Sequence, residues 1–136
     1  MAGYSQTPLV KKLGLKAGMR LQVIGLPLDY AVMVEDLPGG LQWAAEEETG
    51  LDFIHLFTSN QAELEEALPH LIPRLAKSGV LWISWPKKSS GLPADLDENI
   101  VRETGLKNGM VDVKVCAVSQ QWSGLKFVFR LKDRRA

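Results

Sequence analysis

The sequence contains few of the residues that build disulfides and metal centres. It has one cysteine, Cys116, and two histidines, His55 and His70, in 136 residues. A single cysteine excludes an internal disulfide and a multi-cysteine metal site. The histidines share no metal-ligand spacing with each other or with the cysteine, so we expect no bound metal.

Cys116 and His55 both lie inside apolar segments with the pattern of strands. A small thiol and a hydrogen-bonded imidazole are common in protein cores, so both residues are interpreted as buried and structural. The alternatives are a reactive thiol at Cys116 and a general base or ligand at His55.

Several catalytic and targeting motifs are missing. The chain has no Gly-x-Ser-x-Gly nucleophile elbow and no phosphate-binding Gly-Lys-Ser/Thr motif. Residues 1–6 lack the basic and apolar pattern of a secretion signal, and no apolar run approaches the ~20 residues that cross a bilayer. We therefore expect a cytoplasmic protein with no membrane partner.

An excess of charge of either sign is also absent. Sixteen basic residues balance sixteen acidic ones, so no overall field attracts the chain to nucleic acid. Nucleic acid is therefore not an expected partner, unless a local basic patch binds it. The basic C-terminal end from Arg130 to Arg135 is interpreted as a solubilising tail.

Apolar residues make up 46% of the chain, which suits one ordinary globular core. Residues 1–136 are accordingly predicted to form a single α/β domain, with residues 1–14 as an N-terminal helical arm. Thr7 and Pro8 predict the start of that helix and Gly14 predicts its end.

Apolar patterns predict strands at 19–25, 41–45, 53–57, 80–85, 111–117 and 125–131. Helices are predicted at 29–35, 60–77 and 95–105, with capping boxes that pair Asn60 with Glu63 and Asp95 with Glu98. Helices that alternate with strands imply a three-layer α/β fold. Its sheet is predicted to be mostly parallel, with about six strands and a C-terminal antiparallel hairpin.

Parts of the chain resemble Rossmann-like, S-adenosylmethionine-dependent methyltransferases. The segment Leu15 to Gly25 resembles the entry to their first strand, and Leu75 to Ser84 resembles the stretch through their fifth strand. The closing hairpin lies where that fold has its reversed last strand. The resemblance implies a methyltransferase-like Rossmann fold and S-adenosylmethionine as the cofactor.

The chain also departs from that family. Leu26 to Asp29 follows Gly25, where the family has a Gly-rich turn that lets the backbone approach the cofactor. Only Glu46 or Glu47 could replace the family's ribose-binding carboxylate, and an acidic turn is more often a solvated surface. About 30 residues separate the first strand from the Asp52 strand, too few for two complete βα units. We therefore expect a truncated fold without catalytic methyl transfer.

The chain is more similar still to a family of small bacterial proteins of unknown function. This resemblance implies no mechanism for the chain. It is carried by Gly3-Tyr4-Ser5, Thr7-Pro8-Leu9, residues 11–14, residues 85–91, residues 113–118 and residues 122–127.

Ligands of open α/β sheets bind beyond the carboxyl ends of the parallel strands. Four connections are predicted to meet there: the loops 25–29, 58–60 and 85–90 and the hairpin turn 119–124. Their indoles, ammonium groups and hydroxyls suit a ligand with a flat ring and an anionic group, such as a nucleotide. The alternative is a set of ordinary solvated loops. The candidate ligand-binding residues are Gly25, Pro27, Trp85, Lys87, Lys88, Ser89, Ser90, Trp122, Ser123 and Lys126.

Three functions follow from these observations. We favour a non-catalytic methyltransferase-like domain that binds a small anionic or nucleotide-like ligand or a protein partner. The second is a reduced S-adenosylmethionine-dependent methyltransferase or another nucleotide-using transferase, with Asp29 or His55 as candidate bases. The third is a structural module that forms a homodimer along an exposed sheet edge.

Overall fold

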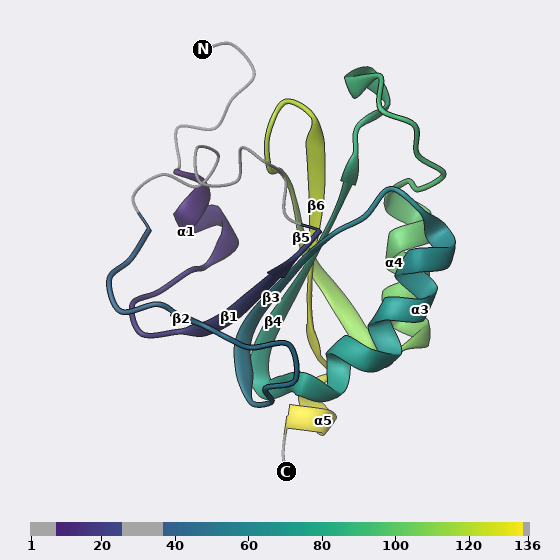
Figure 1. Ribbon diagram of the computed structural model, residues 1–136. Coiled ribbons are helices and arrows are strands. Elements are labelled where there is room, and N and C mark those ends of the chain that lie inside the picture. The colour runs from purple at the N-terminus through teal and green to yellow at the C-terminus, as the bar shows by residue number, and fades with distance from the viewer. Residues whose placement is uncertain (1–7, 26–36, 135–136) are drawn as a thin grey trace.

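A six-stranded sheet forms the centre of the computed structural model, which describes residues 8–25 and 37–134 (Figure 1). The strand order is β2-β1-β3-β4-β6-β5. The first four strands are parallel to one another, β6 is antiparallel to β4 and β5 is antiparallel to β6. The predicted α/β fold, with a mostly parallel sheet closed by an antiparallel hairpin, is confirmed. The strands are β1 (Arg20–Ile24), β2 (Gln42–Trp43), β3 (Leu51–Phe57), β4 (Leu75–Pro86), β5 (Met110–Ala117) and β6 (Trp122–Phe129).

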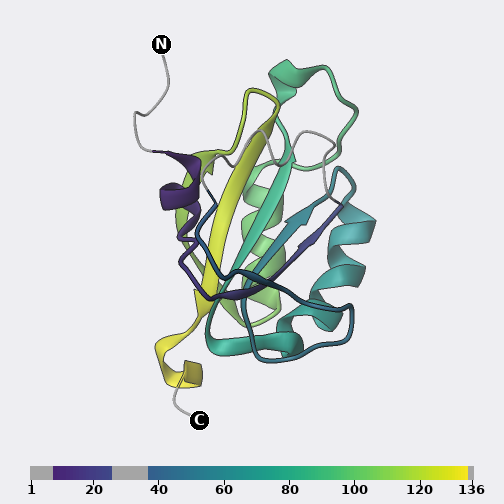
Figure 2. The ribbon, with the colours of Figure 1, turned by 60° about the vertical axis from the view of Figure 1, so that its left-hand side comes forward.

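Helices cover both faces of the sheet, which gives the predicted three layers (Figures 1 and 2). The helices α3 (Gln61–Leu71) and α4 (Glu98–Lys107) pack on one face, and α1 (Leu9–Leu13) lies on the other. Short helical turns at η1 (Ile72–Arg74), η2 (Lys88–Ser90) and α5 (Leu131–Arg134) complete the described elements. The layer formed by α1 is thin, because that helix has only five residues.

The two central strands are buried on both faces. Residues 53–58 and 81–86 are all buried, as expected for continuous apolar strands inside a parallel sheet. Side chains that face α3 and α4, such as Leu56 and Ile83, form one hydrophobic cluster. Side chains that face α1, such as Phe53 and Trp82, form the other.

The N-terminal helix is held to the sheet by one buried hydrogen bond. The indole Nε1 of Trp82, in β4, donates to the backbone oxygen of Leu13 at 2.9 Å. Gly14 then ends the helix with a φ of 80°, as predicted from the sequence. Thr7 lies outside the described residues, so its predicted capping role is not seen.

One helix cap is as predicted and one is not. Asn60 caps α3, because its side chain accepts from the Glu63 N–H at 3.0 Å. The cap of α4 is Asp97, whose carboxylate accepts from the Ile100 N–H at 2.9 Å. The predicted cap, Asp95, instead accepts from the backbone N–H of Gln61 at 2.7 Å and so joins the loop to the start of α3.

The predicted helix 60–77 is too long. Helix α3 ends at Leu71, η1 contains Pro73, and β4 begins at Leu75, five residues before the predicted strand. Proline removes a backbone N–H donor, which favours the break, and Leu75 then pairs with Leu51 of β3. The predicted helix 29–35 lies outside the described residues.

No helix lies between β2 and β3 in the fully described segment 44–50. The two-residue strand β2 pairs with β1, and the chain then turns directly into β3 on the other side of β1. The short stretch of chain before Asp52 therefore has no crossover helix between β2 and β3. This agrees with the truncated fold expected from the sequence.

We predict that Gly105→Ala destabilises the protein, although alanine favours helix by about 1 kcal/mol over glycine. Gly105 lies in α4, and a Cβ added there would overlap the ring of Phe127 in β6. Overpacking of this kind costs about 1–3 kcal/mol. Chemical denaturation of Gly105→Ala and of Gly105→Ala with Phe127→Leu tests this. The double variant is expected to lose less stability than the sum of the two single variants, and strict additivity would contradict the proposed clash.

Candidate functional site

The carboxyl ends of the parallel strands meet the hairpin turn at one edge of the sheet, as the sequence predicts. The Thr58 N–H donates to the Ser84 carbonyl at 3.0 Å, which joins the ends of β3 and β4. The Lys87 N–H donates to the Gln121 carbonyl at 2.8 Å, which joins the loop after β4 to the hairpin turn.

The two candidate tryptophans point to opposite faces of the sheet. Pro86 is the pairing partner of Trp122, so Trp85 is one residue out of step with Trp122. Trp85 is 5% exposed and packs in the cluster beneath α3 and α4. Trp122 packs on the α1 side, where its ring contacts Phe57 edge-on at 5.1 Å between centroids. No single pocket contains both indoles.

The remaining candidates are divided between the loop and the hairpin. Lys88 and Ser89 are exposed in η2, while Ser90 accepts a hydrogen bond from the Leu92 N–H. Lys87 is half-buried beside the hairpin turn. Ser123 pairs with Trp85, and Lys126 pairs with Trp82 further along the strand. Pro27 lies outside the described residues, and ligand binding by this set stays a prediction.

A different cleft opens where the chain changes direction within the sheet. From β1 the chain crosses to β2 on one side and then to β3 on the other, which makes the carboxyl ends of β1 and β3 a topological switch point. Such points are the usual ligand sites of open α/β sheets. A cleft of about 370 Å³ lies here, bounded by the ends of both strands and by α3, and we call it the switch-point cleft.

The switch-point cleft has an apolar floor and an acidic wall. Ile24, Leu56, Phe57 and Ala67 contribute apolar surface. The polar side chains come from the end of β3 and from one face of α3, where spacings of three and four residues align them. They are Thr58, Glu63, Glu66 and His70.

Gly25 is the one described candidate from the sequence that lines this cleft. Its φ is 71°, and a Cβ there would overlap the carbonyl oxygen of Phe57. Only glycine therefore lets the end of β1 lie so close to the end of β3. The sequence analysis missed Glu63, Glu66 and His70, although their helical spacing marks them as one face of α3.

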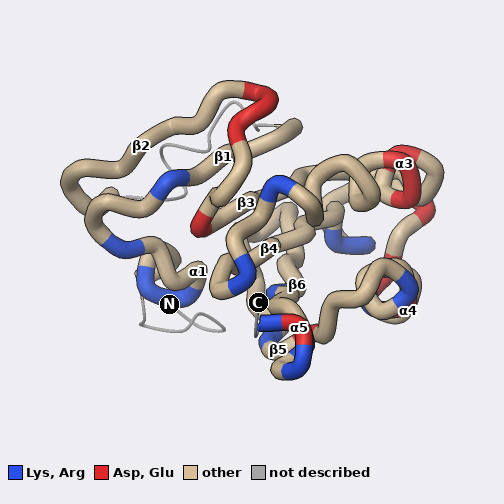
Figure 3. The backbone as a smooth tube through the Cα atoms, turned by 90° about the horizontal axis from the view of Figure 1, so that it is seen from below, with Lys and Arg blue, Asp and Glu red and all other residues tan. Residues whose placement is uncertain are grey.

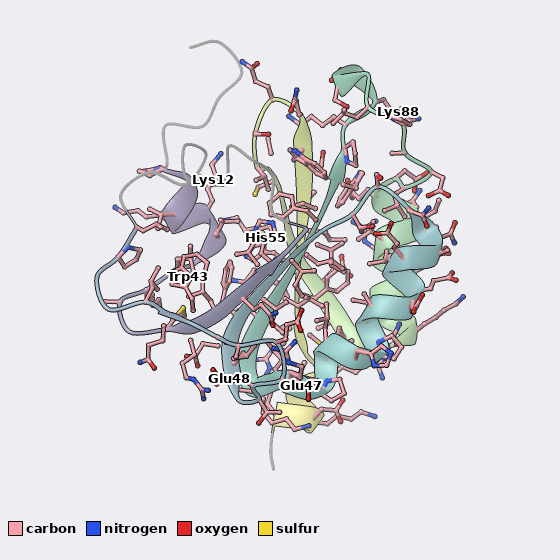
Figure 4. The ribbon with its side chains drawn as sticks, in the orientation of Figure 1. Lys12, Trp43, Glu47, Glu48, His55 and Lys88 are labelled. Atoms are coloured by element: carbon pink, nitrogen blue, oxygen red, sulfur yellow. The ribbon has the colours of Figure 1, made fainter. Side chains whose placement is uncertain are left out.

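The acidic turn is at the wrong end of the sheet to hold a cofactor's ribose. Glu48 pairs with Arg20, the first residue of β1, and the Glu48 carbonyl accepts from Arg74, just before β4. A hydrogen bond from the Ala45 N–H and the pairing with Arg20 lower the pKa of Glu48. Figure 4 accordingly shows Glu47 and Glu48 at the end of the molecule opposite Lys88.

The described residues therefore do not fit S-adenosylmethionine as the fold family holds it. No carboxylate after β2 reaches the carboxyl edge of the sheet within the described segment 44–50. The sequence named Glu46 or Glu47 as possible replacements but favoured an ordinary solvated turn, and the structure agrees with the second interpretation because this turn lies at the amino ends of the strands. We derive no methyl-transfer step from this site.

His55 is a core residue, as interpreted from the sequence. It is fully buried in β3, its Nε2 is 2.7 Å from the Ser84 hydroxyl, and its ring stacks on Phe57 at 4.2 Å. Burial lowers the pKa of His55 to about 3. A neutral imidazole enclosed by the core cannot reach a ligand in the cleft, so the structure does not support His55 as a base.

Cys116 is half-buried in β5, close to the interpretation of a buried small residue. Burial raises the pKa of its thiol, and the ammonium groups of Lys12, Lys114 and Lys87 offset part of that rise. Within residues 8–25 and 37–134, no group of three or more His, Cys, Asp or Glu side chains could hold a metal ion. No helix in the same ranges is long and apolar enough to span a membrane.

Comparison with protein families gives a match over most of the chain. The model of the family described as "Protein of unknown function (DUF3052)" matches residues 10–131. No sequence among the curated proteins matches significantly.

Solved structures similar to this chain include several methyltransferases. A SAM-dependent methyltransferase from Aquifex aeolicus has a TM-score of 0.63 at 18% identity, covering 88% of this chain and 86% of its own. A TehB-like SAM-dependent methyltransferase from Corynebacterium glutamicum has a TM-score of 0.57 at 12% identity, covering 95% and 91%. A methyltransferase from Pyrococcus furiosus has a TM-score of 0.59 at 16% identity, covering 88% and 78%. These similarities confirm the predicted methyltransferase-like fold.

We predict that His55 makes the fold sensitive to acid. The unfolded chain binds a proton at an ordinary histidine pKa near 6.5, whereas folded His55 stays neutral down to about pH 3. The free energy of unfolding therefore falls as the pH falls between these values, by about 1.4 kcal/mol per pH unit from this residue. Chemical denaturation at pH 7.5, 6.0 and 5.0 measures the slope.

The His55→Gln variant is expected to lose this part of the slope. His70→Gln is the matched control, because it replaces the other histidine of the chain, which is exposed on α3. Equal slopes in the His55→Gln variant and the unmodified protein would contradict the assignment.

Proposed function

Because the chain belongs to the DUF3052 family of proteins of unknown function and has a methyltransferase-like fold, we propose that it is a non-catalytic binding domain. Its ligand is a small nucleoside-like molecule held in the switch-point cleft. The observation that carries this proposal is the cleft itself, with a volume of about 370 Å³ at the carboxyl ends of β1 and β3. This volume falls within the roughly 300–1,000 Å³ of small-molecule sites.

The chemistry of the cleft favours a particular kind of ligand. The apolar surface of Ile24, Leu56 and Phe57 suits a flat ring, and the carboxylates of Glu63 and Glu66 accept hydrogen bonds from hydroxyl or amino groups. The same two carboxylates repel an anionic group. A nucleoside-like ligand without a charged group therefore suits this cleft better than the anionic or nucleotide-like ligand that the sequence suggests.

Three features support binding without transfer. Leu26-Pro27-Leu28 follows Gly25 in place of a Gly-rich turn, and the acidic turn after β2 is occupied by Arg20 and Arg74 at the amino ends of the strands. In addition, His55 is enclosed in the core. The alternative is a reduced methyltransferase, and the similarity of the fold is the one observation that supports it. Accumulation of S-adenosylhomocysteine during incubation of the protein with S-adenosylmethionine would replace our proposal with that alternative.

The homodimer hypothesis has less support from the exposed edge of the sheet. Val113 and Val115 in β5 are 53% and 50% exposed, which offers some apolar surface. The same strand has an irregular register between Asp112 and Lys114 and presents the lysine at its edge. Bulges and edge lysines are common means by which proteins prevent edge-to-edge pairing.

We predict that adenosine or an adenosyl compound raises the melting temperature and that Glu66→Gln weakens the effect. A ligand at 100 times its dissociation constant stabilises by about 2.7 kcal/mol, which is a shift of several degrees for a domain of this size. Loss of a hydrogen bond to a charged group costs about 1.5–3 kcal/mol, so Glu66→Gln should weaken binding by roughly tenfold or more. Thermal shift and isothermal titration with adenosine, S-adenosylmethionine and S-adenosylhomocysteine measure both.

Glu65→Gln is the matched control for this experiment. Glu65 is the neighbouring exposed residue of α3 and does not line the cleft, so its replacement should leave affinity unchanged. Equal weakening by both substitutions would indicate binding elsewhere on α3. The absence of any shift with all three compounds would reject a nucleoside-like ligand and direct the search to a protein partner.

A further inference from the structure

Four lysines gather on the α1 face of the closing hairpin, and we call them the lysine cluster. They are Lys12 in α1, Lys16 in the segment after it, Lys114 in β5 and Lys126 in β6. Lys114 and Lys126 are direct pairing partners on neighbouring strands. The Lys114 ammonium also donates to the Lys12 carbonyl at 3.3 Å, which brings the hairpin and the helix together.

Lys126 is half-buried and is related to two other members of the cluster, because it pairs with Lys114 and feels the charge of Lys16. Burial lowers the pKa of Lys126, and the charges of Lys114 and Lys16 lower it further. Its pairing partner on the other neighbouring strand is Trp82. The indole N–H of Trp82 already donates to the Leu13 carbonyl, so this side chain offers Lys126 only an apolar surface. Neither neighbouring strand therefore places a carboxylate opposite Lys126.

The cluster has no counter-charge within the part of the chain that the structure describes. The ion pairs found there join Arg20 to Glu48 and Arg102 to Glu98 and Asp112, and none includes a lysine of the cluster. Figure 3 shows stretches of acidic residues on α3 and in the turn between β2 and β3. Like charges placed directly opposite each other on paired strands are destabilising, so this arrangement has an energetic cost in the free protein.

A fifth lysine extends the positive field toward the edge of the sheet. The charges of Lys12, Lys114 and Lys87 all act on the Cys116 thiol, which lies two residues beyond Lys114 in β5. Lys87 and Lys126 are two of the binding residues predicted from the sequence. Trp85, which the sequence grouped with them, lies on the opposite face.

We propose that the lysine cluster binds a small anion of the phosphate or pyrophosphate type. Several ammonium groups around one half-buried lysine match a compact oxyanion with more than one negative charge. Single-stranded nucleic acid instead needs a groove that follows its backbone, with bases stacked on aromatic side chains. The site lies on the opposite face of the sheet from the α3 wall of the switch-point cleft, so it does not depend on the proposed function.

Inorganic pyrophosphate is the probe that tests this site. In the full chain it should raise the melting temperature, and Lys126→Gln should abolish most of that shift and weaken the dissociation constant at least tenfold. Without pyrophosphate, Lys126→Gln should melt at the same or a higher temperature, because it removes repulsion within the cluster. Lys107→Gln is the control, since Lys107 is exposed on α4 on the other side of the sheet. Equal shifts in both variants, or no shift in the unmodified protein, would overturn the proposal.

Additional ligands identify the source of the anion, and a second variant tests the site if Lys126→Gln does not fold. If Lys126→Gln weakens the binding of adenosine diphosphate as much as it weakens the binding of pyrophosphate, the site recognises the phosphate groups of the nucleotide. Tight binding of a single-stranded oligonucleotide without binding of pyrophosphate would overturn the small-anion proposal. Should Lys126→Gln not fold, Lys114→Gln should also weaken pyrophosphate binding, and an unchanged affinity would count against the site. Glu66→Gln, which alters only the switch-point cleft, should bind pyrophosphate normally.

Discussion

The hydrogen bond from the Trp82 indole to the Leu13 carbonyl connects the N-terminal layer to the rest of the molecule. Strands β3 and β4 are buried on both faces, yet the only described helix on one of those faces is α1, with five residues. So short a helix is unstable by itself and depends on tertiary contacts. The buried 2.9 Å bond ends α1 at a fixed point above β4. It thereby sets where Lys12 lies relative to Lys114 and Lys126, so the charge distribution of the α1 face depends on it.

The sequence predicted the elements whose local signals agree with their tertiary surroundings. The apolar run 53–57, the Asn60 cap and Gly14 each have a single plausible reading, and the structure contains all three. The errors fall where two signals compete. Leu75 continues the helical spacing of Leu68 and Leu71, but it is the first residue of β4 because it pairs with Leu51. Likewise Asp95 and Asp97 are both plausible caps of α4. Asp97 is the cap, whereas Asp95 accepts from the first residue of α3, which lies beside the loop.

The predicted loops do meet at one edge of the sheet, but their two indoles lie on opposite faces. Which loops meet at an edge follows from strand direction, and the mostly parallel sheet with a closing antiparallel hairpin was predicted from the sequence. Which side chains share a face follows from register, and a shift of one residue reverses the face. Trp122 pairs with Pro86 and not with Trp85, and this single step separates the two indoles. The cleft residues Glu63 and Glu66 were missed because a solvated helix face and a cleft wall have the same sequence pattern.

The loss of a crossover helix connects the acidic cleft with the absence of a ribose-binding carboxylate. Because the chain returns from β2 directly to β3, the turn 44–50 passes back to the amino ends of the strands, where Arg20 and Arg74 hold it. The Glu48 carboxylate therefore stabilises the turn at the amino ends of the strands. The described wall of the cleft beside β1 is then α3, so the polar side chains available to a ligand lie on one helix face, together with Thr58 at the end of β3. In the proposed function the ligand is recognised by side chains of α3, and this arrangement favours a binding role over group transfer.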